Sequence, residues 1–318
     1  MNAREEWLQA RRAGLGGSDM GAILGLSKFK TPVDVWMEKT GRSESSTETL
    51  QMRFGNYAEE FVAREYCAKT GHAVQRFTSM LRHPDAPILG NVDRLVVPAG
   101  AKIASHKSEI RTDLGLECKT ASAFSAMDAT EWGEEGTDLV PPSYLVQCTT
   151  YMALTGCNAW DLAVLFGNQE VRVYHLRRDR ELEAEIIARA SEWWNRYVIA
   201  DVPPAPICDA DVRALFPTSA AGKTIEAVEE TLTMLEALRK AKAEIKALEE
   251  TADTAALAIK ALLGDAEALT LNGKPLVTWK SSKPAQRFDT SAFKEAHPDL
   301  YTAFLKAGEP ARRFLIKE

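Results

Sequence analysis

The sequence of 318 residues lacks the cysteine patterns of small secreted domains and zinc modules. Its five cysteines are odd in number and widely spaced, with no C-x-x-C pair, which excludes a disulfide framework and a zinc ribbon: Cys67, Cys118, Cys148, Cys157 and Cys208. No stretch approaches the roughly 20 apolar residues that cross a bilayer, and the polar, charged start is unlike a signal peptide. We therefore expect reduced thiols, no membrane partner and a cytoplasmic location.

A strong excess of positive charge is also missing. The formal net charge is -6, from 39 basic and 45 acidic residues. This disfavours a general polyanion-binding surface but allows a local basic groove, because phosphate contacts depend on where the positive groups lie. With 45% hydrophobic and 26% charged residues, the composition is that of a globular protein rather than a disordered or fibrous one.

Helical and strand patterns follow one another along the first two thirds of the chain. Helices are expected near 2–12, from Ser18-Asp19, after Thr31-Pro32, and over 49–69, 142–155 and 178–200. Short runs rich in branched residues predict strands at 88–97, 115–120, 160–166 and 171–176. Helices and strands interleaved in this way indicate an α/β fold.

The last third has a different composition. Residues 224–263 are dense in Ala, Leu, Glu and Lys and contain no Gly or Pro, which predicts one long helix or a helical hairpin. Asn272-Gly273 is a two-residue hairpin signal, and a final helix is expected from about 290. Basic residues outnumber acidic ones after the hairpin begins, a pattern of either a nucleic-acid grip or an ordinary basic surface.

One group of residues suggests chemistry. Glu117 and Lys119 project from the same face of a predicted strand, Cys118 points to the other face, and pairing with the 88–97 strand would bring Asp93 beside them. Two carboxylates and a carbonyl oxygen suit Mg²⁺, and a lysine can orient or help deprotonate an attacking water. Such a set could cut a phosphodiester.

The tripeptide E-x-K alone is weak evidence, because it also occurs by chance on solvated strand faces. Glu244-Ile245-Lys246 has the same spacing, but it falls in the long helical stretch, where residues two apart do not share a face. The copy at 117–119 has both a strand context and an upstream aspartate.

Five ordered blocks carry a resemblance to a known family: RRAGLGGSD (11–19), FGNYAEEFV (54–62), GNVDRL (90–95), LECKT (116–120) and YLVQCTTYM (144–152). They resemble the YqaJ viral recombinase family, to which phage lambda exonuclease is related. The resemblance implies a restriction-endonuclease-like, PD-(D/E)xK core, with a mixed central sheet flanked by helices. We accordingly expect a nuclease domain at 1–215, a helix or helical hairpin at 216–265, and a basic hairpin-helix element at 266–318.

The family resemblance also implies an activity, which is Mg²⁺-dependent digestion of double-stranded DNA from 5′ ends to expose 3′ single strands for recombination. By the resemblance, Asp93, Glu117 and the Cys118 carbonyl hold metal, two ions in all, with Mn²⁺ as a substitute. Lys119 matches the catalytic lysine. Glu59 matches a helix glutamate near the metals, although its neighbour Glu60 leaves that register open by one position.

Four further residues match the family's contacts to the terminal 5′ phosphate: Arg11, Ser18, Asn91 and Gln147. Ser18 at a helix start beside an arginine suits an anion physically, although an N-cap for Ser18 and a surface role for Arg11 are equally compatible with the sequence. Asn91 departs from the serine of the lambda enzyme and keeps hydrogen-bonding ability.

The implied partners are double-stranded DNA ends, a single-strand annealing protein and further copies of the chain, as a trimer by the resemblance. Two alternatives stay open. One is a catalytically inactive DNA-binding module, which the complete Asp93, Glu117 and Lys119 set disfavours. The other is an iron–sulfur nuclease of the CRISPR-associated type, which would need four cysteines with clustered spacing.

Overall fold

The computed structural model describes residues 9–43, 49–128, 130–306 and 312–317. The chain forms two compact units that divide between Phe216 and Pro217. Most of the helix predicted at 2–12 lies outside the described residues, of which 9–12 are helical. Within the described part of the chain, no helix has both the length and the apolar character needed to cross a bilayer.

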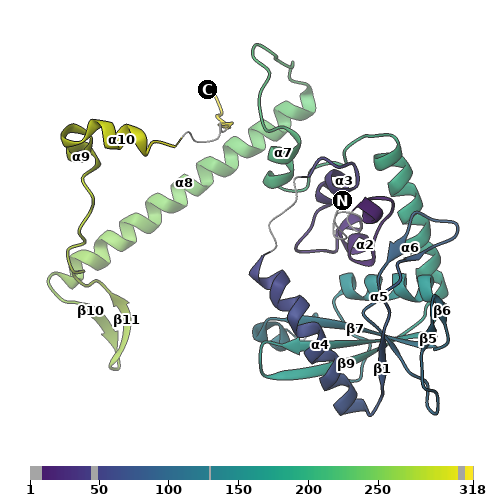
Figure 1. Ribbon diagram of the computed structural model, residues 1–318. Helices are drawn as coiled ribbons and strands as arrows, with labels where there is room; N and C mark the ends of the chain where they lie inside the picture. Colours follow the sequence, from purple (N-terminus) through teal and green to yellow (C-terminus); the bar gives the residue numbers. More distant parts are fainter. Residues whose placement is uncertain (1–8, 44–48, 129, 307–311, 318) are drawn as a thin grey trace. The chain divides into compact units, whose positions relative to one another are not determined.

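A five-stranded mixed sheet forms the centre of the first unit (Figure 1). Its strands are β1 (Val74–Arg76), β4 (Arg94–Val96), β7 (Leu114–Ala121), β8 (Ala159–Phe166) and β9 (Glu170–Arg177). They lie in the order β1-β4-β7-β8-β9, and all neighbours are antiparallel except β7 and β8. Parallel neighbours need a crossover connection, which α5 (Pro142–Thr155) supplies.

Helices cover both faces of this sheet. On one face, α4 (Leu50–Thr70) packs its buried Tyr66 into the same cluster as Leu116 of β7. On the other face, Met152 of α5 packs with Leu162 of β8. Alternation along the strands therefore sends neighbouring side chains to different layers. The predicted mixed sheet flanked by helices is confirmed.

Three more helices pack on the outer side of α5: α2 (Gly17–Ile23), α3 (Pro32–Lys39) and α6 (Arg180–Trp193). Their buried Met20, Trp36 and Ile186 share one apolar cluster with Val146 of α5. The helix predicted over 178–200 is α6, and it continues as a π-helical turn at Trp194–Ile199. This layer places the start of α2 against α5.

The prediction of a single strand over 88–97 is wrong. The chain forms β3 (Leu89–Gly90), breaks, and resumes as β4. The Leu89 N–H donates to the Leu15 carbonyl at 2.9 Å, and β3 pairs with β2 (Leu81–Arg82), so these residues cannot continue the β4 ladder. Asn91 and Asp93 consequently lie in the break, beside the central strands.

The remaining short elements of the first unit are β5 (Ser105–His106), β6 (Glu109–Ile110), the 3₁₀ turn η1 (Ala123–Met127) and α7 (Asp209–Leu215). In the second unit, one continuous helix, α8 (Glu229–Leu263), occupies the stretch for which a hairpin was the alternative. Asn272 and Gly273 both have positive φ, 53° and 78°, and join β10 (Ala268–Leu271) to β11 (Lys274–Thr278). Two short helices follow, α9 (Thr290–Ala296) and α10 (Pro298–Ala303).

Candidate active site

Strand β7 presents Glu117 and Lys119 toward α5. Glu117 is buried, and the Lys119 Nζ lies 2.7 Å from Glu117 Oε1. Cys118 points to the other face, where it joins the cluster under α4. Burial lowers the pKa of Lys119, but Glu117, Tyr151 and Asp93 together raise it by more, so the net shift is upward and the ammonium group keeps its charge.

Asp93 lies directly before β4, and its carboxylate reaches across to β7. The Cys118 N–H donates to Asp93 Oδ2 at 2.9 Å, which places this carboxylate on the main chain between Glu117 and Lys119. Burial and then the nearby Glu117 carboxylate raise the pKa of Asp93 well above its ordinary range. The structure thus brings Asp93, Glu117 and Lys119 together.

The two carboxylates have the chemistry of a cation site. Glu117 Oε1 accepts from Lys119 and Gln147, whereas the buried Glu117 Oε2 has no hydrogen-bond partner among the described residues. A buried, unsatisfied carboxylate oxygen is costly, and a hard divalent cation would satisfy it. The described residues hold no cluster of three or more acidic, histidine or cysteine side chains suited to a metal, so water or a carbonyl such as that of Cys118 would complete the ligands of a cation at Asp93 and Glu117.

Helix α5 lines the site with Tyr144, Gln147 and Tyr151, which are three and four positions apart in the sequence. Gln147 donates through Nε2 to Glu117 Oε1 at 2.7 Å and to the Tyr151 hydroxyl at 3.0 Å. Tyr144 places its ring centroid 5.8 Å from Lys119 Nζ. Gln147 was expected at the site from the sequence, whereas Tyr144 and Tyr151 were not, although their spacing puts all three on the same helix face.

The start of α2 lies against this face of α5. A Cβ on Gly17 would come within 2.8 Å of the Tyr151 ring and 3.2 Å of Gln147 Cγ, so only glycine permits the approach. A Cβ on Gly90 would come within 3.2 Å of the same ring. Ser18 therefore follows a glycine that lies against Gln147 and Tyr151, and Asn91 follows a glycine that lies against Tyr151 and Leu154.

Arg11 is also at the start of α2. Its Nη2 lies 3.2 Å from the place where a Gly16 Cβ would be, and its carbonyl accepts from Lys39 Nζ at 3.1 Å. The prediction that α2 begins with Ser18 or Asp19 as N-cap is wrong, because Gly16 is the N-cap. Ser18 is an exposed residue of the first turn, which leaves its hydroxyl accessible.

A buried ionic cluster supports this helix start. The Gly16 N–H donates to Asp19 Oδ2 at 2.9 Å, and the same carboxylate contacts Lys39 Nζ at 2.6 Å and Lys30 Nζ at 2.8 Å. Burial raises the pKa of Asp19, but the two lysines lower it by more, so the net shift is downward. Sequence reasoning missed this cluster, because the three residues are distant in sequence and carry no motif.

Comparison with known proteins agrees with the site. The family model of the YqaJ-like viral recombinase domain matches residues 6–158. The YqaJ protein of Bacillus subtilis strain 168 is 33% identical over 326 residues, an alignment that covers 99% of this chain and 95% of that protein. This chain belongs to the YqaJ-like viral recombinase family.

Among solved structures, an alkaline exonuclease from Laribacter hongkongensis is similar with a TM-score of 0.47 and 18% identity, over 62% of this chain and 93% of that one. A phage-related exonuclease from Haemophilus somnus 129PT has a TM-score of 0.39 and 14% identity, over 59% and 96% of the two chains. Family membership and the grouping of Asp93, Glu117 and Lys119 are the two observations on which a nuclease activity can be proposed.

The two candidates for the family's helix glutamate, Glu59 and Glu60, both bind Arg94 in this YqaJ-like chain. Glu59 Oε1 accepts from Arg94 Nη1 at 2.5 Å, and Glu60 Oε2 accepts from Arg94 Nη2 at 2.9 Å. The charge of Glu59 contributes to the raised pKa of Asp93. Because Arg94 holds both glutamates, these contacts do not decide which of the two is the family's helix glutamate.

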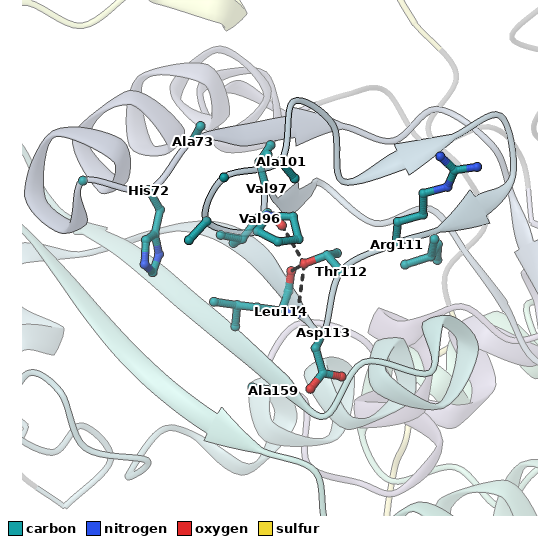
Figure 2. A pocket seen from close by; sticks show the side chains of 15 residues that line it. His72, Ala73, Val96, Val97, Ala101, Arg111, Thr112, Asp113, Leu114 and Ala159 are labelled. Carbon is teal, nitrogen blue, oxygen red and sulfur yellow. Dashed lines mark hydrogen bonds between the residues drawn. The ribbon is translucent and has the colours of Figure 1, made fainter.

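A recess of about 840 Å³ is lined by Thr112, Asp113 and Leu114 at the start of β7 (Figure 2). Lys119 lies toward the other end of that strand. The polar side chains of the recess already have partners within the chain. Asp113 Oδ1 accepts from the Asn158 main chain at 2.9 Å, and Arg111 donates to Glu109 at 2.6 Å. Asp93 and Glu117 do not line this recess, so we assign it no part in the chemistry.

Proposed function

We propose that this YqaJ-like chain is a Mg²⁺-dependent exonuclease that digests one strand of duplex DNA from its 5′ end. Its product would be the 3′ single strand that phage-type recombination uses. The observation that carries the proposal is the convergence of Asp93, Glu117 and Lys119, with one buried Glu117 oxygen that has no hydrogen-bond partner among the described residues.

Asp93, Glu117 and the Cys118 carbonyl would hold the cation, as two ions in the family pattern. Bound Mg²⁺ would polarise the scissile phosphate and lower the pKa of water, and Mn²⁺ has the same preference for oxygen ligands. The two carboxylates supply negative charge on one side of the sheet, which is the charge that such a cation requires. Glu59, held by Arg94, would act on this pair through its field rather than by contact.

Lys119 and Gln147 would orient the reacting groups. Both contact Glu117 Oε1, so their positions relative to the carboxylate are fixed before DNA arrives. A charged lysine beside the cleaved bond stabilises the negative charge that develops there, and a preorganised donor costs no reorganisation in the transition state. The Gln147 amide would lie between the cation site and the incoming DNA end.

Recognition of the 5′ phosphate would fall to Arg11, Ser18 and Asn91, together with Gln147. The proposal is supported by Gly17 and Gly90, which precede Ser18 and Asn91 and both lie against Tyr151, and by Arg11 Nη2, which lies beside Gly16 at the start of α2. A guanidinium and a hydroxyl suit a terminal phosphate dianion, which binds more strongly than an internal phosphodiester because it carries more charge.

The structure bears differently on the two alternatives, the inactive DNA-binding module and the iron–sulfur nuclease. An inactive DNA-binding module would retain the family fold without cleavage, and nothing in the geometry favours it. An iron–sulfur nuclease needs four converging thiols. Cys118 lies on the α4 face of the sheet, whereas Cys148 and Cys157 lie in the cluster on the α5 face, and Cys208 is exposed. A cluster of that kind is disfavoured.

Digestion of duplexes labelled at either the 5′ or the 3′ end of one strand tests the proposal. We expect Mg²⁺-dependent release of the 5′ label first, with faster release from 5′-phosphate than from 5′-hydroxyl ends. Ca²⁺ should support binding without turnover. First release of the 3′ label would contradict the polarity, and binding without any release in Mg²⁺ would favour the inactive module.

The same preparation tests the implied partners. The resemblance implies a trimer and an annealing protein that coats the exposed strand. A molar mass of three chains, or of a multiple of three chains, would support the trimer, and faster strand exchange when an annealing protein is added would support the partner. A strictly monomeric enzyme would contradict the trimer.

A further inference from the structure

From Met234 to Leu262, helix α8 has an apolar residue at every first and fourth position of a seven-residue repeat. The spacing between these residues alternates between four and three, without a break: Met234, Leu238, Ala241, Ile245, Leu248, Ala252, Ala255, Ile259 and Leu262. A repeat of this kind places all of them along one seam and is the pattern of a coiled coil. The seam is referred to below as the α8 seam.

Most of the α8 seam is open to solvent within the second unit, and Leu238 and Ile259 are half-buried. Ile245 is 54% exposed, Leu248 69% and Leu262 74%, and Leu263, outside the seam, is the one buried residue of the described helix. A helix of 35 residues is about 52 Å long and gains most of its stability from packing an apolar face. We therefore expect another helix or segment to pack against the α8 seam.

We propose that the occupant is α8 of a second copy of this chain, in an antiparallel two-stranded coiled coil. The repeat is compatible with this arrangement, because reversing one helix about a point between Lys246 and Ala247 aligns first positions with fourth positions throughout. The central layers then pair residues of one copy with residues of the other as follows: Ile245 with Leu248, Leu238 with Ala255, Ala252 with Ala241, and Ile259 with Met234. Each layer contains only apolar side chains.

Charges beside the seam select the antiparallel orientation. In that orientation Lys242 of each copy faces Glu249 of the other, giving two attractive contacts related by symmetry. A parallel pair would instead set Glu244 against Glu249 twice, which is repulsive. Sliding the antiparallel pair by one repeat in either direction would oppose Glu249 to Glu249 or Lys242 to Lys242. The charges therefore specify one orientation and one register.

These flanking side chains are available for the pairing. Lys242, Glu244 and Glu249 are exposed, and none of them has an ion pair with another described residue. The proposal is independent of the proposed nuclease activity, whose residues all lie in the first unit. It also concerns a two-fold contact, which is distinct from a three-fold ring formed by other surfaces.

Analytical ultracentrifugation of the full chain, over a range of concentrations, tests the pairing with charge reversals. Glu249→Lys should raise the dissociation constant about tenfold, because two attractive contacts become repulsive. Lys242→Glu should do the same, and the double variant should restore association to near the wild-type value. In a parallel pair Glu249→Lys would tighten association, which would overturn the proposal.

Two further variants complete the test. Glu236→Lys makes the same charge change on the opposite face of α8 and should leave association unchanged. Ile245→Asp should abolish the association step and halve the mass, while the helical circular dichroism of the chain is largely retained. A mass unaffected by Ile245→Asp, or a wild-type chain that is monomeric at every concentration, would show that another occupant covers the seam and would refute the pairing.

Discussion

Glu117 offers one carboxylate oxygen to two donors and leaves the other buried without a partner among the described residues. This division of roles follows from its place in β7, where one side faces Lys119 and α5. A glutamine at this position would keep the size of the side chain and remove its charge. The residue is therefore suited to separate an electrostatic role from a packing role.

Glu117→Gln and Lys119→Ala should each reduce cleavage by at least about a hundredfold while leaving DNA binding mostly intact, since each removes a contact to the cation or the transition state. Nucleotide release in Mg²⁺ and binding in Ca²⁺ measure the two effects. Glu244→Gln and Lys246→Ala alter the same tripeptide spacing within α8 and should leave cleavage unchanged. Near wild-type cleavage by either site variant would refute the assignment.

Arg11→Ala should slow digestion of 5′-phosphate ends by about 10- to 100-fold, because a charge-assisted contact of about 1.5–3 kcal/mol is lost. Ends with a 5′-hydroxyl lack that partner and should be digested at an unchanged rate. Arg12→Ala, an exposed neighbour, is the matched control. An equal loss on both kinds of end would indicate a folding or general binding defect instead.

Asp19→Asn should lower the free energy of unfolding by about 3 kcal/mol at pH 7, because it leaves the buried Lys39 without its counter-ion. The pKa of Asp19 lies below its ordinary value of 3.8 in the folded state. Its contribution is thus complete above that value and is lost as the pH falls below it. Urea unfolding from pH 7 to pH 3 should show the wild type approaching the variant, and a constant gap would contradict this account.

At the scale of elements, the contact between α2 and α5 assembles the proposed phosphate site. Gly17→Ala should destabilise the protein by about 1–3 kcal/mol, because the new methyl group would come within 2.8 Å of the Tyr151 ring. Gly55→Ala is the control: no atom lies within 4 Å of its Cβ, and alanine favours α4. Urea unfolding should separate the two, and equal stabilities would show that the helices move apart freely.

The sequence predicted the regular elements that depend on local pattern. Strands β7, β8 and β9 and helices α4 and α5 have the expected positions, since branched residues, glycine stops and apolar periodicity are all local signals. The break within 88–97 was not predicted, because it depends on the hydrogen bond from Leu89 to Leu15, a residue more than seventy positions away. Strand β1 was missed because three residues with partial burial carry little pattern.

The candidate site was predictable where residues are adjacent in sequence and less so where tertiary contacts place them. Glu117 and Lys119 follow from strand alternation, and Asp93 was placed correctly beside them although it lies just outside β4. The hydrogen bond from Gln147 to Glu117 could not be predicted, because it joins a helix and a strand that are thirty positions apart in the sequence. The engagement of Glu59 by Arg94 had no signal in the sequence, because arginine contacts follow no fixed spacing.

At the scale of the whole molecule, the site lies within the first unit, and the second unit is compact by itself. A chain ending at Phe216 should therefore retain Mg²⁺-dependent release of nucleotides from short duplexes at a rate within about tenfold of the full chain. Circular dichroism would establish that the shortened chain is folded. A folded but inactive fragment would show that the second unit contributes to the chemistry.

The most direct test of the central claim compares linear with covalently closed circular duplex DNA in Mg²⁺, using the wild type and Glu117→Gln side by side. We predict that the wild type releases mononucleotides from the linear duplex, leaves the closed circle intact, and loses its activity on adding a chelator. Glu117→Gln should release at least about a hundredfold less. Cleavage of the closed circle, or release by Glu117→Gln at the wild-type rate, would contradict a Mg²⁺-dependent exonuclease built on Asp93, Glu117 and Lys119.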